Sequence, residues 1–331
     1  MGERAPLQYL TAAAYWRDMV LSVGPGVLIP RPETELMIDF AEEAVAANPA
    51  LGRGQWVRRD KRCRPALRPQ PRWRHTQPPK EAAKGHLLTS CPLSWPTHPG
   101  SQADLGTGSG ALAVGLARAL PDSPAVWAVD RAAAPLAYVA FNAARLGVAD
   151  RVRPAVGSWY EPLLAAGVPP GSLAGVLSNP PYIPSAVVAG QLQAEVGRHE
   201  PSCALDGGEG LGVDALVPVA AGAVRLLARG GLLVLETGGG EQARYVADVL
   251  RRMRSSAGGP GMAGCAATTA ATGGTGDGAG WAAGSLGEPS GAWAGAECGL
   301  ADDERPAFEA VRIRRDLYGV DRFVTAIRAW E

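Results

Sequence analysis

The sequence predicts an α/β protein built on a doubly wound, mostly parallel, seven-stranded sheet that ends in an antiparallel hairpin. Short apolar runs alternate with helical stretches along most of the 331 residues, which is the order of a parallel sheet covered on both faces. The last two apolar runs, near 310–316 and 321–329, are joined by too few residues for a crossover. These two strands are therefore expected to pair antiparallel.

The elements follow from local patterns. Residues 14–29 are expected to form a short leading hairpin. The segment 34–47 is predicted to be an amphipathic helix, because its apolar residues recur on one face and Glu33 and Glu35 lie at its first turn. The further helices are expected at 111–120, 133–146, 212–228 and 241–253, and the further strands at 125–130, 152–157, 173–178 and 231–237.

Composition limits the possible classes of protein. No apolar run approaches the length of a membrane span, and the start lacks the basic and apolar regions of a secretory signal. The five cysteines have no zinc-ligand spacing, so a reducing compartment and no metal site are expected.

Two segments of biased composition interrupt the α/β pattern. Residues 49–103 hold 11 Lys and Arg against 2 Asp and Glu, and include nine prolines. We interpret 49–102 as a disordered, basic, Pro/Arg-rich insertion; a nucleic-acid-binding arm is the alternative. Residues 255–300 hold 14 Gly and 12 Ala without any Lys or Arg, which indicates a second disordered insertion at 255–305. Both could equally be untranslated gene segments read as protein.

A glycine-rich loop, Asp104-Leu-Gly-Thr-Gly-Ser-Gly110, precedes the helix that starts at 111. Glycines allow tight turns and close approach of a ligand, and the helix start offers free N–H groups. Asp130 ends the next strand and could accept hydrogen bonds from a ribose diol. The arrangement predicts nucleoside binding, without choosing between a nicotinamide dinucleotide and S-adenosylmethionine.

The segment 99–103, Pro-Gly-Ser-Gln-Ala, should form the strand that carries this loop. Such residues make a poor central strand. We therefore expect the first strand to be damaged and ligand binding to be weakened.

A second loop, Asn179-Pro-Pro-Tyr182, follows the apolar strand 173–178. The prolines end that strand and stiffen the loop at its carboxyl end, where open α/β sheets bind ligands. The Asn179 side-chain oxygen and the Pro180 carbonyl are two fixed acceptors, and Tyr182 is a flat wall beside them. Together they suit a planar NH2 group, on a carboxamide or on a base. An ordinary turn is the alternative.

Several motifs together resemble one family, the bacterial and organellar protein-(glutamine-N5) methyltransferases that act on peptide-chain release factors. The enzymes of this family are class I S-adenosylmethionine-dependent methyltransferases. The likeness covers 5–48, 103–254 and 307–331. Its most specific motifs are Ile29-Pro-Arg-Pro-Glu-Thr-Glu35 and Asn179-Pro-Pro-Tyr-Ile-Pro184. Ribosomal-protein glutamine methyltransferases are close relatives, but Arg31-Pro32-Glu33 favours the release-factor branch.

The resemblance implies an enzyme with the S-adenosylmethionine-dependent methyltransferase fold, its catalytic domain formed by 31–48 and 103–331. It would transfer a methyl group from S-adenosylmethionine to the side-chain amide of a glutamine, in a Gly-Gly-Gln motif of a class 1 release factor. Residues 1–30 are expected to be a hairpin region and the remnant link to a missing helical domain, with a weaker hold on the release factor. We expect a monomer without membrane or direct nucleic-acid contact. The expected location is a chloroplast or mitochondrion in a eukaryote, and otherwise the cytoplasm.

The resemblance also assigns site residues. Asn179, Pro180 and Tyr182 are expected to be catalytic, and with Pro181 they would bind the substrate glutamine. Glu200-Pro201 and the segment 31–35 are expected to shape the pocket. The residues expected to bind S-adenosylmethionine are Gly106, Thr107, Gly108, Ser109, Gly110, Asp130, Trp159 and Asn179.

Three other functions stay open. An adenine-N6 nucleic-acid methyltransferase shares the Asn179–Tyr182 loop, because an adenine amine presents similar N–H groups. A nicotinamide dehydrogenase fits the glycine loop but leaves Asn179 unexplained. A non-catalytic binding module is the third possibility, if the first strand is broken.

Overall fold

The computed structural model describes residues 5–49, 99–255 and 305–330. The chain divides into two compact units, residues 1–253 with 306–331, and residues 254–305. The sheet, its helices and both cavities described below belong to the first unit. The predicted insertions at 49–102 and 255–305 lie almost entirely outside the described residues.

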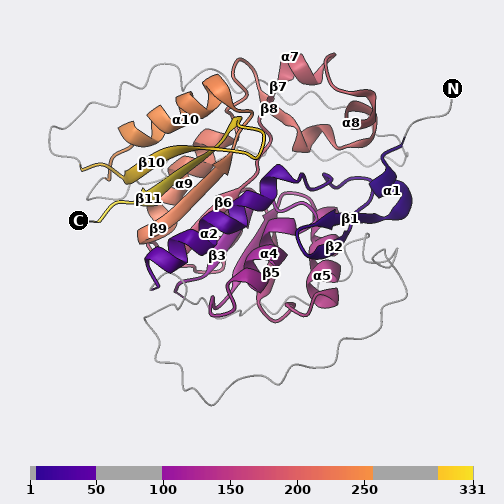
Figure 1. Cartoon of the computed structure of the whole chain (residues 1–331). Coiled ribbons are helices and arrows are strands. Elements are labelled where there is room, and N and C mark those ends of the chain that lie inside the picture. The colour runs from indigo at the N-terminus through magenta and orange to yellow at the C-terminus, as the bar shows by residue number, and fades with distance from the viewer. Residues whose placement is uncertain (1–4, 50–98, 256–304, 331) are drawn as a thin grey trace, which may run out of the picture. The chain divides into compact units, whose positions relative to one another are not determined.

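The helices and strands alternate along the first unit (Figure 1). The helices are α1 (Leu7–Thr11), α2 (Leu36–Ala47), α4 (Ala111–Ala119), α5 (Ala133–Arg145), α6 (Glu161–Ala165), α7 (Ser185–Val188), α8 (Ala194–His199), α9 (Leu216–Leu226) and α10 (Gly240–Arg252), with 3-10 turns η1 (Glu33–Glu35) and η4 (Ser202–Ala204). The strands are β1 (Ala13–Trp16), β2 (Met19–Ser22), β3 (Gln102–Leu105), β4 (Val126–Asp130), β5 (Val152–Val156), β6 (Leu173–Ser178), β7 (Ile183–Pro184), β8 (Asp206–Gly208), β9 (Leu227–Glu236), β10 (Phe308–Arg315) and β11 (Asp321–Arg328).

The main sheet has seven strands in the order β10-β11-β9-β6-β3-β4-β5. Strands β9, β6, β3, β4 and β5 run parallel, whereas β11 is antiparallel to both β9 and β10. This confirms the predicted fold, a mostly parallel seven-stranded sheet with a terminal antiparallel hairpin. The predicted amino-terminal hairpin is also present, as the separate β1–β2 pair.

Each face of the sheet has its own apolar core. Helices α2, α4 and α5 pack on one face together with the β1–β2 hairpin, around residues such as Trp16, Ile38 and Leu116. Helices α6, α9 and α10 pack on the other, around Leu163, Leu216 and Leu250. The chain thus winds in both directions from the centre of the sheet, as the alternating pattern predicts.

The expectation of a damaged first strand is wrong. Strand β3 is complete and central, paired in parallel with β4 on one side and β6 on the other. A ladder needs only backbone groups, and Gln102 N donates to Ala125 O at 2.9 Å while Ala174 N donates to Ser101 O at 2.9 Å. The buried Gln102 side chain fits because a Cβ on neighbouring Gly175 would collide with its Oε1. Strand β3 also begins at the end of the segment predicted to be an insertion.

Between β6 and α9 the structure contains elements that the local pattern did not predict. They are α7, α8, η4 and the two-stranded β7–β8 sheet. The following helix, predicted from 212, begins only at Leu216, and β9 begins at Leu227 rather than at 231. This segment is held by close backbone approach: a Cβ on Gly207 would lie 2.5 Å from Gly212 O and 2.6 Å from Tyr182 Cα.

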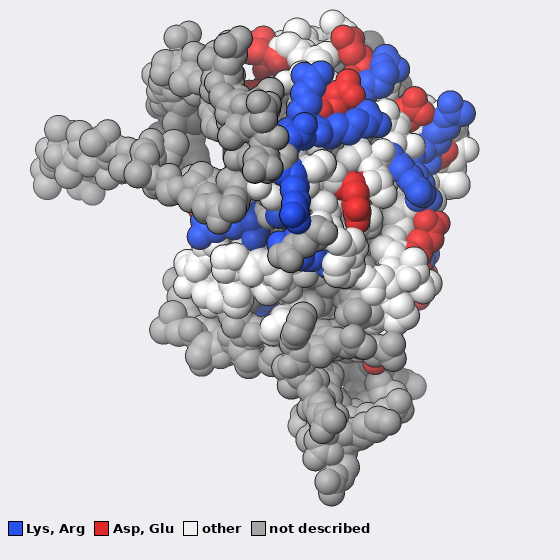
Figure 2. All heavy atoms as spheres, turned by 90° about the vertical axis from the view of Figure 1, so that its left-hand side faces the viewer, with Lys and Arg blue, Asp and Glu red and all other residues white. Residues whose placement is uncertain are grey.

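Charged side chains of both signs are mixed on the face that Figure 2 shows. The described residues include surface ion pairs such as Arg251 with Asp248 at 2.7 Å and Arg314 with Glu43 at 3.0 Å. Among the described residues, no helix is long and apolar enough to cross a membrane.

Candidate active site

The site lies where the direction of strand order changes. From β3 the chain proceeds through β4 to β5 on one side, and then through β6 to β9 on the other. The crevice outside the carboxyl ends of β3 and β6 is therefore a topological switch point, where open α/β sheets bind ligands. Both predicted loops, 106–110 after β3 and 179–182 after β6, lie at this point.

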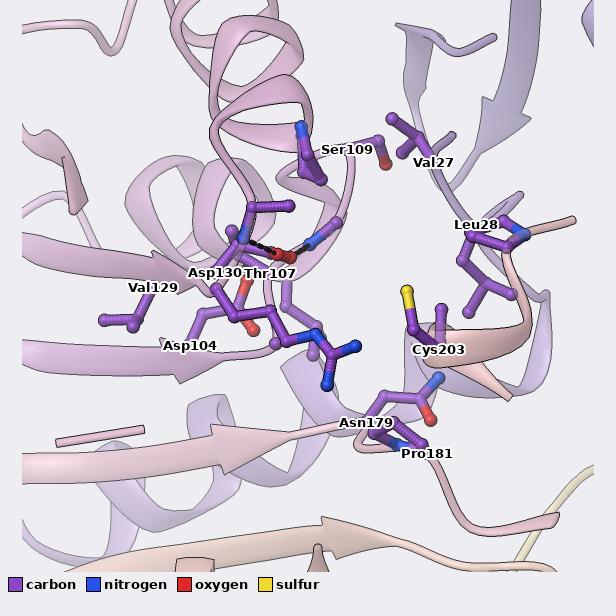
Figure 3. A pocket seen from close by; sticks show the side chains of 18 of the residues that line it. Val27, Leu28, Asp104, Thr107, Ser109, Val129, Asp130, Asn179, Pro181 and Cys203 are labelled. Carbon is purple, nitrogen blue, oxygen red and sulfur yellow. Dashed lines mark hydrogen bonds between the residues drawn. The ribbon is translucent and has the colours of Figure 1, made fainter. Parts of the chain in front are cut away.

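A first cavity of about 200 Å³ opens there (Figure 3). Its walls come from segments far apart in the sequence, which include 106–109 after β3, 129–132 at the end of β4 and 157–159 after β5. The amino-terminal segment contributes Val27, Leu28 and Thr34, and the side opposite the glycine loop is formed by Asn179, Pro181 and the exposed free cysteine Cys203.

The glycine loop has the predicted conformation. Gly106, Gly108 and Gly110 have φ angles of +77°, +54° and +84°, a region in which side chains are strained. Gly110 differs from the other two, because a Cβ there would lie 3.2 Å from Val139 Cα in α5. The structure places this glycine in helix packing, and it does not line the cavity.

Asp104 lines the first cavity and was missed as a site residue. Its Oδ2 accepts hydrogen bonds from Thr107 Oγ1 at 2.6 Å and from Ala113 N at 3.0 Å, which ties the loop to the start of α4. Its Oδ1 is buried and has no hydrogen-bond partner among the residues that the structure describes. Burial raises the pKa of this carboxyl to about 7. The available signal was its position at the end of the strand before the glycine loop.

Asp130 closes the opposite end of the glycine loop. Its Oδ2 accepts the Gly108 amide at 3.1 Å and its Oδ1 accepts the Ala132 amide at 3.0 Å (Figure 3). Burial raises the pKa of this carboxyl as well, against these two hydrogen bonds. Each carboxylate oxygen still has lone-pair capacity for a ligand hydroxyl.

Trp159 forms a side wall of the cavity. It adopts a positive φ of 45°, uncommon for a residue with a side chain. Its ring lies beside the glycine loop, with Cζ3 3.8 Å from where a Cβ on Gly106 would be. Seven of the eight residues predicted to bind the cofactor therefore line one cavity, namely Gly106, Thr107, Gly108, Ser109, Asp130, Trp159 and Asn179.

A second cavity, of about 300 Å³, lies on the other side of Asn179. Pro180 and Tyr182 line this cavity, whereas Pro181 lines the first. Asn179 lines both cavities and thus stands at the partition between them.

The two predicted acceptors at this partition are unengaged. Within the described residues, no donor contacts Asn179 Oδ1 or the Pro180 carbonyl, although Pro180 itself is buried. Both acceptors are therefore available to a ligand that brings two N–H groups.

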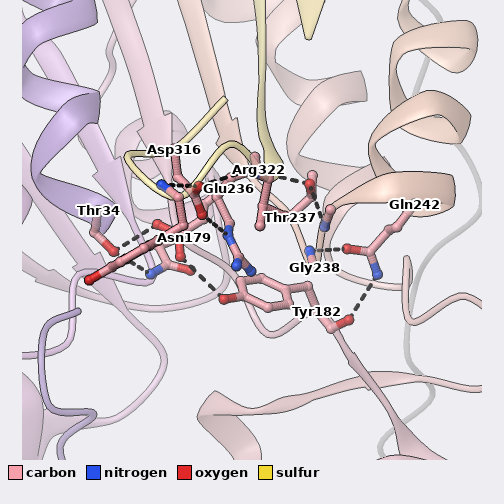
Figure 4. A network of polar contacts seen from close by, with 12 residues as sticks. Thr34, Asn179, Tyr182, Glu236, Thr237, Gly238, Gln242, Asp316 and Arg322 are labelled. Atoms are coloured by element: carbon pink, nitrogen blue, oxygen red, sulfur yellow. Dashed lines mark hydrogen bonds and ion pairs between the residues drawn. The ribbon is translucent and has the colours of Figure 1, made fainter. Parts of the chain in front are cut away.

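A buried polar network stands behind the partition (Figure 4). Asn179 Nδ2 donates to Thr34 Oγ1 at 3.1 Å, and Thr34 Oγ1 donates to Glu236 Oε2 at 2.7 Å. Tyr182 OH donates to the other oxygen, Glu236 Oε1, at 3.2 Å. Burial raises the pKa of Glu236 to about 7, and burial with the nearby Glu236 also raises the pKa of Tyr182. Neither Thr34 nor Glu236 was assigned this contact from sequence.

Arg31 and Glu200, expected to shape the pocket, form an ion pair at 2.7 Å. Arg31 lines the second cavity, while the Glu200 side chain is buried and also accepts the Ile29 amide at 3.3 Å. The pair therefore joins the amino-terminal segment to the loop before η4. Nowhere in residues 5–49, 99–255 or 305–330 does a group of three or more His, Cys, Asp or Glu side chains form a metal site.

Curated relatives align with most of the length of this chain. The chain is 39% identical over 239 residues to the release factor glutamine methyltransferase of Gloeobacter violaceus, which covers 72% of this chain and 64% of the relative. It is 36% identical over 250 residues to the enzyme of that name from Synechocystis, covering 75% of this chain and 66% of the relative. The chain belongs to the release factor glutamine methyltransferase family.

As a member of this family, the chain spans about two thirds of the length of the relatives that it matches. No protein-family model matches it. Among solved structures it is similar to a geranyl diphosphate C-methyltransferase from Streptomyces coelicolor, at 18% identity over 47% of this chain and 45% of that one. The TM-score between the two structures is 0.29.

Proposed function

We propose that this protein transfers a methyl group from S-adenosylmethionine to the side-chain amide nitrogen of a glutamine in a peptide-chain release factor. The observation that carries the proposal is the pair of unengaged acceptors, Asn179 Oδ1 and the Pro180 carbonyl, at the partition between two cavities. A primary amide has two N–H groups on one nitrogen and can satisfy both acceptors at once.

The residues of the first cavity fit S-adenosylmethionine. The unpartnered Asp104 Oδ1 is suited to the ammonium of the methionine part, and Asp130 to the ribose hydroxyls. Trp159 offers an aromatic wall for the adenine. When bound, this cofactor supplies an electrophilic methyl group on a sulfonium.

The chain's own residues would prepare the amide nitrogen. Its lone pair is delocalised into the carbonyl, which makes it a poor nucleophile, and Asn179 is too weak a base to deprotonate it. Asn179 Oδ1 and the Pro180 carbonyl would instead accept its two N–H bonds, turn the lone pair toward the first cavity and stabilise the positive charge that develops. Tyr182 would hold the glutamine side chain in plane.

The acceptor and the setting rest on the relatives and on the resemblance. The relatives are named as release factor glutamine methyltransferases, which supports the glutamine of a Gly-Gly-Gln loop in a class 1 release factor. These relatives are bacterial, and several are cyanobacterial, which supports a site of bacterial-type translation: a chloroplast, a mitochondrion or a bacterial cytoplasm. We propose that the enzyme acts there as a monomer.

Mass spectrometry of a class 1 release factor incubated with the protein and labelled S-adenosylmethionine tests the function. One labelled methyl group on the Gly-Gly-Gln glutamine is expected, and none on a release factor with alanine at that position. Asn179→Ala should reduce turnover by about 10²-fold or more, the scale of a lost transition-state hydrogen bond. Methyl transfer to DNA adenine or a ribosomal protein, with the release factor unmodified, would overturn the proposal.

A further inference from the structure

We propose that Glu236 is a positioning residue which, through Thr34, fixes the orientation of the Asn179 side-chain amide so that Oδ1 faces the acceptor. This inference rests on the proposed function, because it concerns how one of the two amide acceptors is prepared. In this scheme Glu236, which lines neither cavity, and Thr34, which lines the first, contact neither the reacting nitrogen nor the methyl group, and they act through Asn179.

The need for such a device follows from the shape of asparagine. Its oxygen and NH2 group are nearly the same size, so packing alone holds either orientation equally well. In one orientation of Asn179, the NH2 group of the substrate glutamine meets the Asn179 oxygen. In the other orientation it meets the Asn179 NH2 group, and the two donors repel each other. Only a polar contact on the far side of Asn179 can distinguish the two.

Thr34 provides that contact because its hydroxyl has a single proton. The proton is directed to Glu236 Oε2 at 2.7 Å, which leaves Thr34 Oγ1 as an acceptor. An acceptor must face the Asn179 NH2 group, and Nδ2 does lie 3.1 Å from Thr34 Oγ1 (Figure 4). The Asn179 oxygen is therefore on the other side. Glu236 as a carboxylate can only accept, so it imposes the direction of both hydrogen bonds.

The surroundings of Glu236 favour this role over a purely structural one. Its side chain is 1% exposed, and no ion pair to it occurs among the described residues. Arg322 of β11, whose positive charge acts on Glu236, pairs with Asp316 instead, at 3.2 Å. Glu33 of η1 adds negative charge, and in the described part of the chain the Glu236 side chain accepts hydrogen bonds only from the hydroxyl groups of Thr34 and Tyr182. A buried carboxylate without an ion pair is costly, and here it fixes the direction of a hydrogen-bond chain.

Two variants reverse or remove that direction without changing side-chain volume. In Glu236→Gln the new amide can donate to Thr34 Oγ1, which frees the Thr34 proton for Asn179 Oδ1 and favours the wrong orientation. Thr34→Val removes the hydroxyl altogether. Thr34→Ser restores it. The matched control is Thr325→Val, which changes a buried threonine of β11 outside the network.

The test measures kcat, the KM for release factor and the Kd for S-adenosylmethionine, with thermal melting to confirm folding. Glu236→Gln and Thr34→Val should each lower kcat by 10-fold or more, on the scale of one misdirected hydrogen bond, with KM and Kd within a few-fold. Thr34→Ser should recover turnover relative to Thr34→Val, and Thr325→Val should match the unmodified protein. The kcat of the unmodified protein should also rise with pH as Glu236 ionises, and this rise should be absent in Glu236→Gln.

The outcomes separate this inference from the proposed function. A kcat in folded Glu236→Gln within two-fold of the unmodified protein, while Asn179→Ala is inactive, would overturn the positioning role and leave the function intact. Undiminished methyl transfer by Asn179→Ala would overturn the function itself. A KM increase without a kcat change in the Thr34 and Glu236 variants would show that the network binds substrate, and would contradict the inference.

Discussion

Asp104 and Glu236 are two carboxyl groups, each 1% exposed, near the carboxyl ends of β3 and β9. Neither has an ion-pair partner in the described part of the chain, and burial raises the pKa of each to about 7. Strongly perturbed carboxyls in a cleft are typical of functional sites. Asp104 faces the first cavity and Glu236 lies behind the partition. We therefore attribute the free-energy cost of burying these two carboxyl groups to function.

Asp104→Asn should weaken S-adenosylmethionine binding, measured by isothermal titration calorimetry. The variant keeps one oxygen for Thr107 and Ala113 but turns an N–H donor toward the ligand ammonium. The expected loss is about 1–3 kcal/mol, the cost of a mismatched buried polar group. Asp122→Asn, at an exposed position after α4, is the control. An unchanged dissociation constant in Asp104→Asn would show that its free oxygen does not contact the ligand.

At this scale, most of the site residues predicted from the sequence line the two cavities. Glycine positions, the acid ending β4 and the Asn179–Tyr182 loop are all visible within short windows. Thr34 lies in the segment 31–35 that was expected to shape the pocket, but its contacts with Asn179 and Glu236 were not predicted. They span 145 and 202 residues, which no local pattern encodes. Gly110 was predicted to bind the cofactor, but its lack of a side chain serves the packing of α5 against the loop.

At the level of elements, Asn142 in α5 joins three segments. Its side chain is fully buried; Oδ1 accepts the Ser22 amide at 2.8 Å, and Nδ2 donates to Ser22 O at 3.0 Å and to Ser109 O at 2.9 Å. The amino-terminal hairpin, α5 and the glycine loop are thereby held together by one side chain. This explains how the hairpin can support the cofactor cavity.

Asn142→Ala should lower the free energy of unfolding, measured by urea denaturation, by about 2–4 kcal/mol. It removes three hydrogen bonds, so buried backbone groups of Ser22 and Ser109 lose the side chain that they contact. Asn142→Asp keeps the shape but loses the donated bonds, so it should also be destabilised. A loss below about 0.5 kcal/mol, the size of an ordinary surface substitution, would contradict this role.

The elements that sequence reasoning missed or misjudged depend on contacts between distant segments. Strand β3 looked too polar, but it is central because Gly175 makes room for the Gln102 side chain. The β7–β8 region has no periodicity of its own. It is held by Gln242 of α10, whose Nε2 donates to Tyr182 O at 2.8 Å and to Gly212 O at 3.1 Å. Periodic segments such as β6 and α5 were placed within a residue or two, because their own burial pattern specifies them.

For the molecule as a whole, the dependence of stability on pH should come from the interior. Ion pairs at the surface, such as Arg251 with Asp248, are half exposed and contribute little. Asp18 and Asp316 have lowered pKa values, so they change the free energy of unfolding only at and below their ordinary pKa of 3.8. At higher pH the dependence comes from three carboxyls whose pKa is raised by full or partial burial, Asp104, Asp130 and Glu236.

The free energy of unfolding should therefore fall as pH rises from about 4.5 to about 7. In this window the folded protein keeps protons on Asp104 and Glu236 that the unfolded chain has released, so each group stabilises the fold fully below its unfolded pKa and loses that contribution as pH approaches its folded pKa. Each carboxyl contributes a slope of about 1.4 kcal/mol per pH unit.

Urea denaturation at several pH values should show this decline, and the double variant Asp104→Asn with Glu236→Gln should flatten it. A slope unchanged by the double variant would show that other groups control it. Because the proposed chemistry needs Glu236 ionised, activity and stability should change with pH in opposite directions.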